Sequence, residues 1–323
     1  RLPLDLDALE GRRFLLRMLL AAVDTFVENE DPERPSFHHV DTPTRKMFAD
    51  CLDADYLRAP ILLGPGRVYR VRGQVPKGTL YAGVQLYGKG GRIGNRLRDE
   101  ELRLDDDGNF EVLVSTEKQE GLWLAAEGDE TAVMVRQYYA DREKEAPLTV
   151  SIERVGDLAE PSPLEAERFA DGLERAKRMV KSVFKRTTDA YKMASVMALN
   201  RFVEIPPDQL FPTPDNRYLA AWYRLAPDER ILIRGKLPAA RYFGVSLCNA
   251  WLESYDYQRH PVSLNHAQIE AEADGTFELC LAHHDPGHRN WLSTAGHEGG
   301  YVIARFLLAD GSLPELGLEI VKG

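Results

Sequence analysis

The chain of 323 residues is poor in cysteine, in long apolar runs and in clustered positive charge. Its three cysteines, Cys51, Cys248 and Cys280, are scattered and form no C-x-x-C pair, which argues against a disulfide framework and favours a reducing, cytoplasmic compartment. No apolar run approaches the roughly 20 residues that span a bilayer, so we expect no membrane span. A net charge of −10 without a dense Lys/Arg run argues against nucleic-acid binding.

Several catalytic signatures are also missing. The chain contains no G-x-S-x-G elbow of a serine hydrolase and no H-E-x-x-H helix of a zinc protease. The glycine-rich segment 88–94 lacks the G-K-[ST] of a phosphate-binding loop, so we interpret it as a hairpin loop. Because the chain begins at Arg1, whether a leader precedes it is left open.

The elements that are present alternate between helices and short strands. Apolar residues at three- and four-residue steps predict a helix over 4–29, with Asp5 and Asp7 near its start. A second helix is predicted over 162–200, begun by Ser162 and Pro163, with a kink near Thr187. Alternating runs predict strands, and Asp107-Gly108 predicts a hairpin turn. The predicted strands are 67–75, 79–87, 109–115, 131–139 and 148–154.

The second half of the chain repeats the first. Segment 57–73 aligns with 219–235, and Asp107-Gly108, Trp123 and Asp141 align in the same order with Asp274-Gly275, Trp291 and Asp310. We therefore predict a mainly β protein with added helices, made of two related jelly-roll-like β-sandwich units that arose by internal duplication. The expected parts are an N-terminal helix (1–36), a first sandwich (37–156), a helical connector (157–203) and a second sandwich (204–323).

The duplication offers an internal control for function. The first copy has an ordinary polar loop at 115–122, whereas the second has H-H-D-P-G-H-R-N at 283–290. After the second strand of each copy, 87–101 is matched by the longer 248–266, which is rich in aromatic and ionisable residues. Loops on a rigid scaffold often carry function, so both differences point to a site in the second copy.

Histidine beside a carboxylate is suited to proton transfer at neutral pH, which makes acid–base catalysis on a small, partly apolar molecule our leading hypothesis. A lyase, isomerase or hydrolase would each fit. The predicted catalytic residues are His284, Asp285, His288 and His297. The predicted substrate-binding residues are Arg241, Trp251, Glu253, Asp256, Tyr257, His266, Arg289 and Asn290.

Other interpretations stay open. Asp285-Pro286-Gly287 is also typical of a plain turn. A zinc or iron site using His283, Asp285 and His288 with His297 or His266 has suitable ligand types, but the spacing matches no metal signature, so we expect no cofactor. The chain could instead be a non-catalytic binding module for a lipid, terpenoid or glycan, with Trp251 as its platform. A structural partner of another protein would expose a large apolar patch on the long helix. The oligomeric state is left open.

Three segments resemble a known bacterial family. They are D-N-R-Y at 215–218, R-Y-F-G-V-S-L at 241–247 and D-P-G-H-R-N-W-L-S-T-A-G-H at 285–297. Together they are similar to the domain-of-unknown-function family twelve-fourteen, which is often found with family twelve-fifty-four. The resemblance covers the second copy well and the first more loosely. It implies jelly-roll-like sandwiches with added helices, and it implies no established activity.

Overall fold

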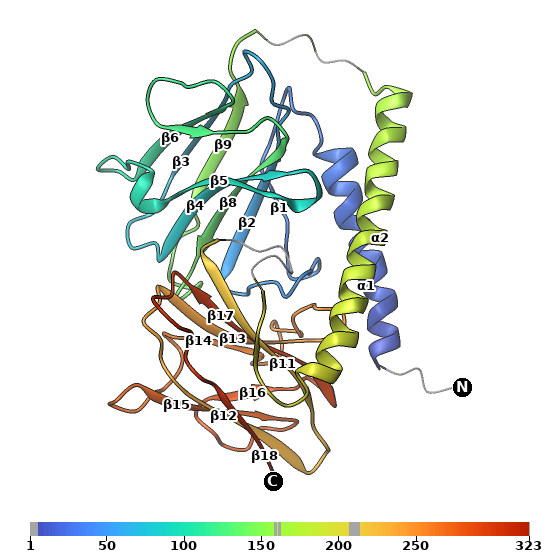
Figure 1. Ribbon diagram of the computed structural model, residues 1–323, viewed down its shortest axis with the longest axis vertical. Coiled ribbons are helices and arrows are strands. Elements are labelled where there is room, and N and C mark those ends of the chain that lie inside the picture. Colours follow the sequence, from blue (N-terminus) through green and yellow to red (C-terminus); the bar gives the residue numbers. More distant parts are fainter. Residues whose placement is uncertain (1–5, 158–159, 161–162, 207–213, 323) are drawn as a thin grey trace. The chain divides into compact units, whose positions relative to one another are not determined.

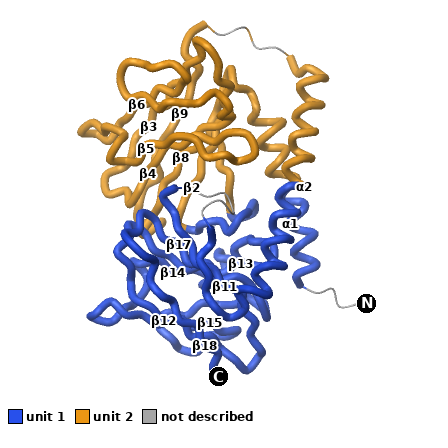
Figure 2. Tube along the Cα trace, viewed as in Figure 1, with its two compact units in different colours: residues 1–18, 43–52, 181–323 blue, residues 19–42, 53–180 orange. Residues whose placement is uncertain are grey.

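The computed structural model describes residues 6–157, 160, 163–206 and 214–322. These residues contain two α-helices and eighteen strands (Figure 1). They form two units (Figure 2). Unit 1 comprises residues 1–18, 43–52 and 181–323, and unit 2 comprises 19–42 and 53–180. The N-terminal helix and the helical connector, set apart as segments of their own by the sequence, are thus each divided between the units.

Both predicted helices form. Helix α1 covers Leu6–Val23 and continues as a π-helical turn at Asp24–Glu28, while helix α2 covers Ala166–Met197. Asp7 lies in the first turn of α1, as predicted; Leu4, Asp5 and Ser162 lie outside the described residues. Helix α2 runs unbroken through the site of the predicted kink, where the Thr187 hydroxyl donates to the Val183 carbonyl oxygen (2.9 Å) within the helix.

Unit 2 contains two sheets. The first has the order β1-β2-β8-β4-β5 and the second the order β7-β6-β3-β9. All pairs are antiparallel except β6 with β7. The predicted strands lie within two residues of the observed ones, because alternating apolar residues mark a strand whose one face is buried. The strands are β1 (His38–His39), β2 (Ala54–Pro60), β3 (Tyr69–Gln74), β4 (Tyr81–Gly88), β5 (Ile93–Arg98), β6 (Asn109–Ser115), β7 (Trp123–Ala125), β8 (Glu130–Tyr138) and β9 (Thr149–Arg154).

Unit 1 repeats this topology strand for strand. Its sheets have the orders β10-β11-β17-β13-β14 and β16-β15-β12-β18, and only β15 with β16 is parallel. Trp291 begins β16 as Trp123 begins β7, so the predicted duplication of an all-β unit is confirmed. The strands are β10 (Val203–Glu204), β11 (Asn216–Arg224), β12 (Glu229–Lys236), β13 (Tyr242–Cys248), β14 (Ser263–Asn265), β15 (Thr276–Ala282), β16 (Trp291–Ser293), β17 (Gly299–Leu307) and β18 (Gly317–Lys322).

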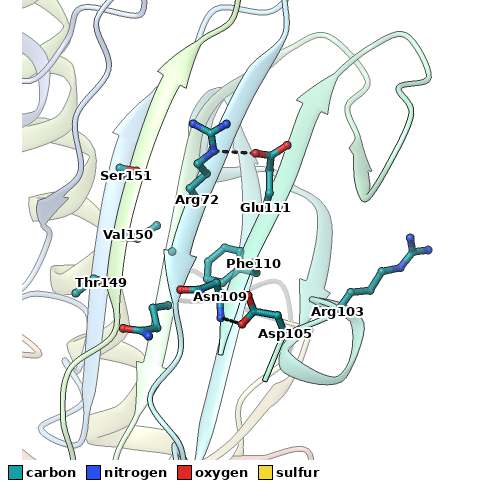
Figure 3. Close-up of a pocket in the computed structure, with 11 residues that line it drawn as sticks. Arg72, Arg103, Asp105, Asn109, Phe110, Glu111, Thr149, Val150 and Ser151 are labelled. Atoms are coloured by element: carbon teal, nitrogen blue, oxygen red, sulfur yellow. Dashed lines mark hydrogen bonds and ion pairs between the residues drawn. The ribbon is translucent and has the colours of Figure 1, made fainter. Parts of the chain in front are cut away.

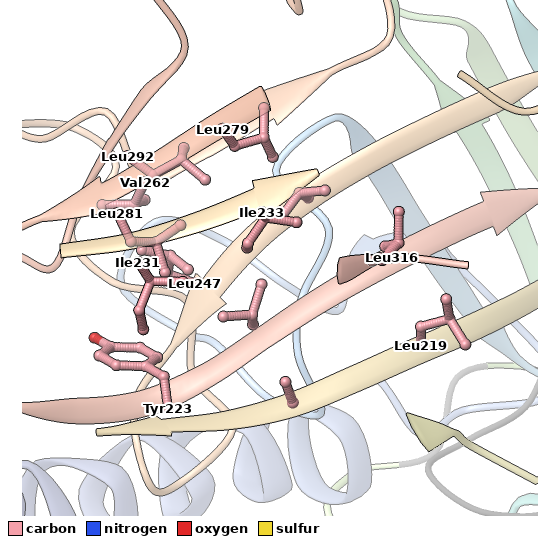
Figure 4. Close-up of a cluster of buried hydrophobic side chains, with 14 of the residues drawn as sticks. Leu219, Tyr223, Ile231, Ile233, Leu247, Val262, Leu279, Leu281, Leu292 and Leu316 are labelled. Carbon is pink, nitrogen blue, oxygen red and sulfur yellow. The ribbon is translucent and has the colours of Figure 1, made fainter. Parts of the chain in front are cut away.

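In unit 1 the core lies between the two sheets. Alternate residues such as Ile231 and Ile233 on β12 and Leu279 and Leu281 on β15 point inward and are fully buried (Figure 4). Each such side chain stabilises the fold by about 1.5–3 kcal/mol relative to exposure. An equivalent cluster fills unit 2. These two layers around one apolar core are the predicted β-sandwiches.

Two turn predictions had different outcomes. The glycine-rich segment 88–94 is a hairpin loop between β4 and β5, closed by a hydrogen bond from the Gly88 nitrogen to the Arg92 carbonyl oxygen (2.8 Å). Asp107-Gly108 forms a tight turn in which Gly108 has φ +81°. The hairpin prediction there is wrong, because β5 and β6 on either side belong to different sheets.

The three cysteines are buried and form no disulfide, as predicted for small core residues. Across the part of the chain that the structure describes, no helix is long and apolar enough to cross a bilayer.

Candidate functional site

The predicted loop 283–290 is held largely by its own neighbours. His284 and Asp285 are exposed, and the Asp285 carboxylate accepts a hydrogen bond from the Gly287 nitrogen (2.8 Å). Gly287 has φ +73°, which glycine adopts without strain. This is the plain turn that D-P-G also allowed.

The rest of the loop is similarly occupied. His288 Nε2 lies 3.3 Å from Glu278 Oε1, and Arg289 forms an ion pair with Glu272. Asn290 is fully buried and clamps the loop: its amide donates to the carbonyl oxygens of Glu270 (2.8 Å) and Glu278 (3.0 Å). These contacts shape the loop rather than present groups to a ligand.

His297 stands in a different and more unusual setting. Its Nδ1 lies 2.9 Å from the Thr294 carbonyl oxygen, and its Nε2 lies 3.0 Å from Glu10 Oε2 on helix α1. The carbonyl oxygen can only accept, so Nδ1 carries a proton. A neutral imidazole then has no proton at Nε2 to give to the carboxylate. The Nε2–Oε2 contact therefore needs one more proton, held by the imidazole or by the carboxyl of Glu10.

Asn249 joins this pair to a second carboxyl. Its side-chain nitrogen donates to Glu10 Oε2 (2.9 Å) and to Glu253 Oε2 (3.1 Å). Its side-chain oxygen accepts from the backbone nitrogens of Trp251 and Glu253, which fixes the turn that follows β13. The other oxygen of Glu253 accepts from Arg17 (2.7 Å), also on α1. We call Glu10, Arg17, Asn249, Glu253 and His297 the unit 1 polar cluster.

The pKa values of the two carboxyls in the cluster are shifted in opposite directions. Burial alone would raise the pKa of Glu10, but the hydrogen bond and charge of His297, with Asn249 and Arg13, outweigh it and leave the pKa below its ordinary value. Burial dominates at Glu253 and raises its pKa in spite of the bonds from Arg17 and Asn249. Paired groups whose pKa values are driven apart are a common feature of acid–base sites.

An aromatic wall borders the polar cluster. The Tyr255 ring stacks on the His297 ring with 4.0 Å between centroids and 10° between planes. The Tyr255 hydroxyl hydrogen-bonds the Tyr223 hydroxyl (2.7 Å), and burial raises the pKa of Tyr255 well above its ordinary value. Glycine is required at Gly300, since a Cβ there would lie 1.9 Å from the Tyr255 hydroxyl.

Segment 43–52 supplies further buried charges beside the cluster. The Lys46 ammonium donates to the carbonyl oxygens of Ser254 (2.9 Å) and Tyr255 (2.8 Å). Asp50 accepts from the backbone nitrogen and the hydroxyl of Ser254 (2.9 and 2.7 Å). Burial lowers the pKa of Lys46 and raises that of Asp50. The turn 249–257 is thus held by segments that precede it by about two hundred residues.

Trp251 does not form an open shelf. Its ring is stacked between Phe14 (5.6 Å between centroids) and Phe184 (5.7 Å), and its Nε1 donates to the Asp7 carbonyl oxygen (2.8 Å). Gly11 also lies against the ring, where a Cβ would come within 2.4 Å. The tryptophan therefore fastens both helices to unit 1.

The other predicted binding residues are spread over unit 1. Asp256 pairs with Arg259 (2.5 Å), which lowers the pKa of Asp256. Tyr257 lies beneath the Lys46 ammonium, 4.3 Å from its ring centroid. His266 meets the ring of Tyr242 edge-on. Arg241 is half-buried, and its backbone nitrogen donates to the Leu307 carbonyl oxygen (3.0 Å).

Three of the predicted residues, His297, Glu253 and Trp251, lie in or beside the unit 1 polar cluster. Glu10, Arg17 and Asn249 were missed. Glu10, Phe14 and Arg17 recur at helical spacing in 4–29, a stripe that combines an aromatic with two opposite charges and could have signalled a polar interface. The only sequence signal for Asn249 was its place at the start of the aromatic segment that follows β13.

The cluster belongs to one copy alone. Counting along the equivalent strands β4/β13 and β8/β17, the first copy has Gly88 and Gly128 at the positions of Asn249 and His297. Residues that serve only the sandwich would be expected in both copies, as the two tryptophans are. This difference marks the cluster as a feature added to the common scaffold.

A separate surface hollow of about 690 Å³ lies on the outer face of the β7-β6-β3-β9 sheet of unit 2 (Figure 3). It is lined by polar residues such as Arg72, Glu111 and Asn109, and Arg72 is ion-paired with Glu111 (2.7 Å). Unit 1 has the same pairing between Arg234 and Glu278 (2.6 Å). Since both copies share this pairing, it belongs to the sheet surface and not to a specialised site.

Among the described residues, one group of carboxylates lies close enough together to hold a metal ion: Glu127, Asp129 and Glu130. Arg92 forms ion pairs with all three, so the protein itself places a cation at this group of carboxylates. In the unit 1 polar cluster both nitrogens of His297 are taken up by protein acceptors. The absence of a cofactor stays a prediction.

Comparison with known proteins bears on the family. Residues 224–310 match the family described as Protein of unknown function (DUF1214). This segment is similar to the DUF1214 family. The predicted resemblance is therefore confirmed, and this segment holds Asn249, Glu253, Tyr255 and His297, whereas Glu10 and Arg17 come from outside it.

Two solved structures are similar to the whole chain. An uncharacterized protein from Burkholderia cenocepacia is 29% identical with a TM-score of 0.92, covering 99% of this chain and 91% of that one. A Vibrio parahaemolyticus protein shares the fold at 12% identity and a TM-score of 0.55, covering 96% and 98%. The Burkholderia protein is thus similar to this chain over the helices as well as both sandwiches. A search of curated proteins finds no match.

Proposed function

We propose that this protein is an enzyme that transfers protons on a small, partly apolar molecule at the unit 1 polar cluster, as a lyase, isomerase or hydrolase. One observation carries the proposal: His297 and Glu10 are joined by a contact that needs a proton which either group can hold. A buried imidazole–carboxyl pair that holds a proton between its partners is suited to give and take protons in a reaction.

The residues divide into roles. His297 keeps its predicted role as the proton-transfer group, and Glu10 takes the carboxylate role that the sequence assigned to Asp285. Glu253, with its raised pKa, would serve as a neutral acid or as a hydrogen-bond donor to a developing negative charge. Asn249 is a positioning residue, because it holds both carboxyls at fixed places.

The surroundings favour a partly apolar substrate. Tyr255 covers one side of His297, and Phe14 and Trp251 lie along the same face of α1. The cluster reaches the surface beside Arg13, whose side chain is half exposed and pairs with Glu10 (2.7 Å). A movement of the first turns of α1 would open the cluster to a ligand, as lids do in many enzymes.

The first experiment tests the shared proton without a substrate. Proton NMR of the whole protein is expected to show a resonance far downfield of the amides, lost in Glu10→Gln and His297→Gln. His288→Gln changes a histidine that also faces a carboxylate but lies on the loop, and it should keep the signal. A spectrum without this resonance in the wild-type protein would remove the observation on which the proposal rests.

The second experiment tests catalysis. In a panel of small substrates with exchangeable or eliminable protons, Glu10→Gln and His297→Gln should each lower turnover by about 10²–10⁴-fold. His288→Gln should stay within twofold of wild type. The alternative, a non-catalytic binding module, predicts instead ligand binding without turnover, strongly reduced in Trp251→Ala and unaffected by the histidine changes.

A further inference from the structure

Helix α1 carries apolar residues on both of its faces, yet the described residues cover only one of them. The inner face carries Phe14, Met18 and Ala21, which are buried. The outer face exposes six leucines, with Leu16 at 64% and Leu20 at 65%. The exposed leucines are Leu6, Leu9, Leu15, Leu16, Leu19 and Leu20. A leucine-rich helix face is normally buried against something, so the outer face calls for an occupant other than the described residues.

The charges on this face have one sign. The exposed residues of α1 are the six leucines, Ala8, Arg12 and Arg13, and none of them is acidic. Its two acids, Asp7 and Glu10, are not exposed, and Glu10 is engaged in the polar cluster. In a chain of net charge −10, a surface of leucines and arginines without a carboxylate is a local exception.

The part of α2 that belongs to unit 1 has the same character. Over residues 181–197 it carries Lys181, Lys185, Arg186 and Lys192 against the single acid Asp189. Met193, Val196 and Met197 are exposed there, Val196 at 78%. Because Trp251 stacks on Phe14 and on Phe184, these two helical stretches are fastened to the same place in unit 1.

We propose that this basic, leucine-rich face docks on an anionic phospholipid surface. Leucines inserted at the boundary of headgroups and acyl chains, with arginines and lysines beside them, are the combination by which helices lie in a membrane interface. At 18 residues and about 1.5 Å per residue, α1 is a surface-lying element about 27 Å long. The face attaches the protein to a bilayer without crossing it.

Charge also decides against a second copy of the chain as the occupant. In a two-fold symmetric dimer through α1 the same patch meets itself, so Arg12 and Arg13 would face their own counterparts with no exposed acid on the helix to pair with them. Like charges brought together in an interface oppose binding. An anionic lipid surface meets the same arginines with opposite charge.

The test is co-sedimentation of the full chain with vesicles. Wild-type protein should bind vesicles of phosphatidylcholine mixed with phosphatidylglycerol, bind phosphatidylcholine alone much more weakly, and release as salt is raised. Leu16→Gln and Leu20→Gln should each weaken binding about tenfold. Arg12→Glu should weaken it about fivefold or more. None of these residues contacts the polar cluster, so the proton NMR signal should persist in all three variants.

Two matched controls come from the same chain. Leu62→Gln changes a leucine between β2 and β3 that is 52% exposed, and Arg224→Glu reverses an exposed arginine at the end of β11. Both should bind vesicles like wild type, and circular dichroism should show every variant folded. The proposal is overturned if wild-type protein ignores anionic vesicles, if the controls lose binding equally, or if sedimentation velocity reveals a dimer that Leu16→Gln dissolves.

Discussion

Replacing Arg17 by methionine would test whether the unit 1 polar cluster holds helix α1 in place. Arg17 is the only cation that hydrogen-bonds the Glu253 carboxylate among the described residues, at 2.7 Å. The Glu253 side chain is 0% exposed and that of Arg17 is 15% exposed. Methionine keeps most of the arginine's apolar stem but leaves the carboxylate with the Asn249 amide alone.

The size of the effect follows from this burial. Removing one partner of a buried ion pair typically costs about 3–5 kcal/mol, because the remaining charge stays buried without compensation. The Asn249 bond and the option of protonating Glu253 reduce the cost, so we expect about 2–4 kcal/mol at pH 8. With a urea slope near 3 kcal/mol/M, this moves the unfolding midpoint of unit 1 by about 1 M.

The pH dependence has a definite sign. Burial already raises the pKa of Glu253 in the folded protein, and losing Arg17 raises it further. A carboxyl whose folded pKa exceeds its unfolded value binds more protons when folded, so it destabilises the fold increasingly as pH rises between the two values. The difference between Arg17→Met and wild type should therefore shrink from pH 8 to pH 5.

Tryptophan fluorescence during urea unfolding is a suitable assay, because three of the four tryptophans, Trp222, Trp251 and Trp291, belong to unit 1. Arg13→Met is the matched control, since Arg13 pairs with Glu10 from a half-exposed position and should cost less than about 1 kcal/mol. Adding Glu253→Leu to Arg17→Met should restore much of the stability. If Arg17→Met and Arg13→Met behave alike and without pH dependence, the cluster does not fasten α1.

Three further predictions follow from packing and burial. Gly11→Ala should destabilise the protein by about 1–3 kcal/mol and so lower the midpoint of thermal unfolding, because the new Cβ would meet the Trp251 ring. At an ordinary helical glycine the same substitution would stabilise the protein. Asn290→Ala should cost about 2–4 kcal/mol in urea unfolding by leaving the loop carbonyls unbonded, whereas His284→Ala, at an exposed position of the same loop, should cost almost nothing. A disulfide reagent should label none of the three buried cysteines in the native protein and all three in guanidinium, the more so because burial raises the pKa of Cys248 and Cys280.

Local patterns predicted the strands well, because a strand with one buried face alternates apolar and polar residues along the sequence. The duplication supplied the topology of one unit once the other was understood. Sheet membership around Asp107-Gly108 was not predictable, since a turn sequence fixes local geometry and says nothing of which strand pairs beyond it.

The site was predicted only in part, for a similar reason. Residues 283–290 are close in sequence and looked like a centre, but in the folded chain their side chains bond to the loop itself and to the neighbouring segment 270–278. Glu10 reaches His297 across 287 positions of sequence, and no spacing rule links residues so far apart. Asn249 bonds the carboxyl of Glu10 on α1 as well as that of Glu253, so its role could be recognised only from the position of α1 in the fold.

That separation also governs how the chain can be made. A ribosome that adds about 5–20 residues per second needs roughly 15–60 seconds between releasing Glu10 and releasing His297. Throughout this interval α1, with leucines on its outer face and Phe14 on its inner face, has no finished unit 1 to pack against. Segment 43–52 likewise lacks one of its partners until Arg305 has been synthesised, because the Arg305 guanidinium donates to the Ala49 carbonyl oxygen. We therefore expect unit 1 to be completed only after synthesis of its last strands, and the nascent chain to depend on chaperones until then.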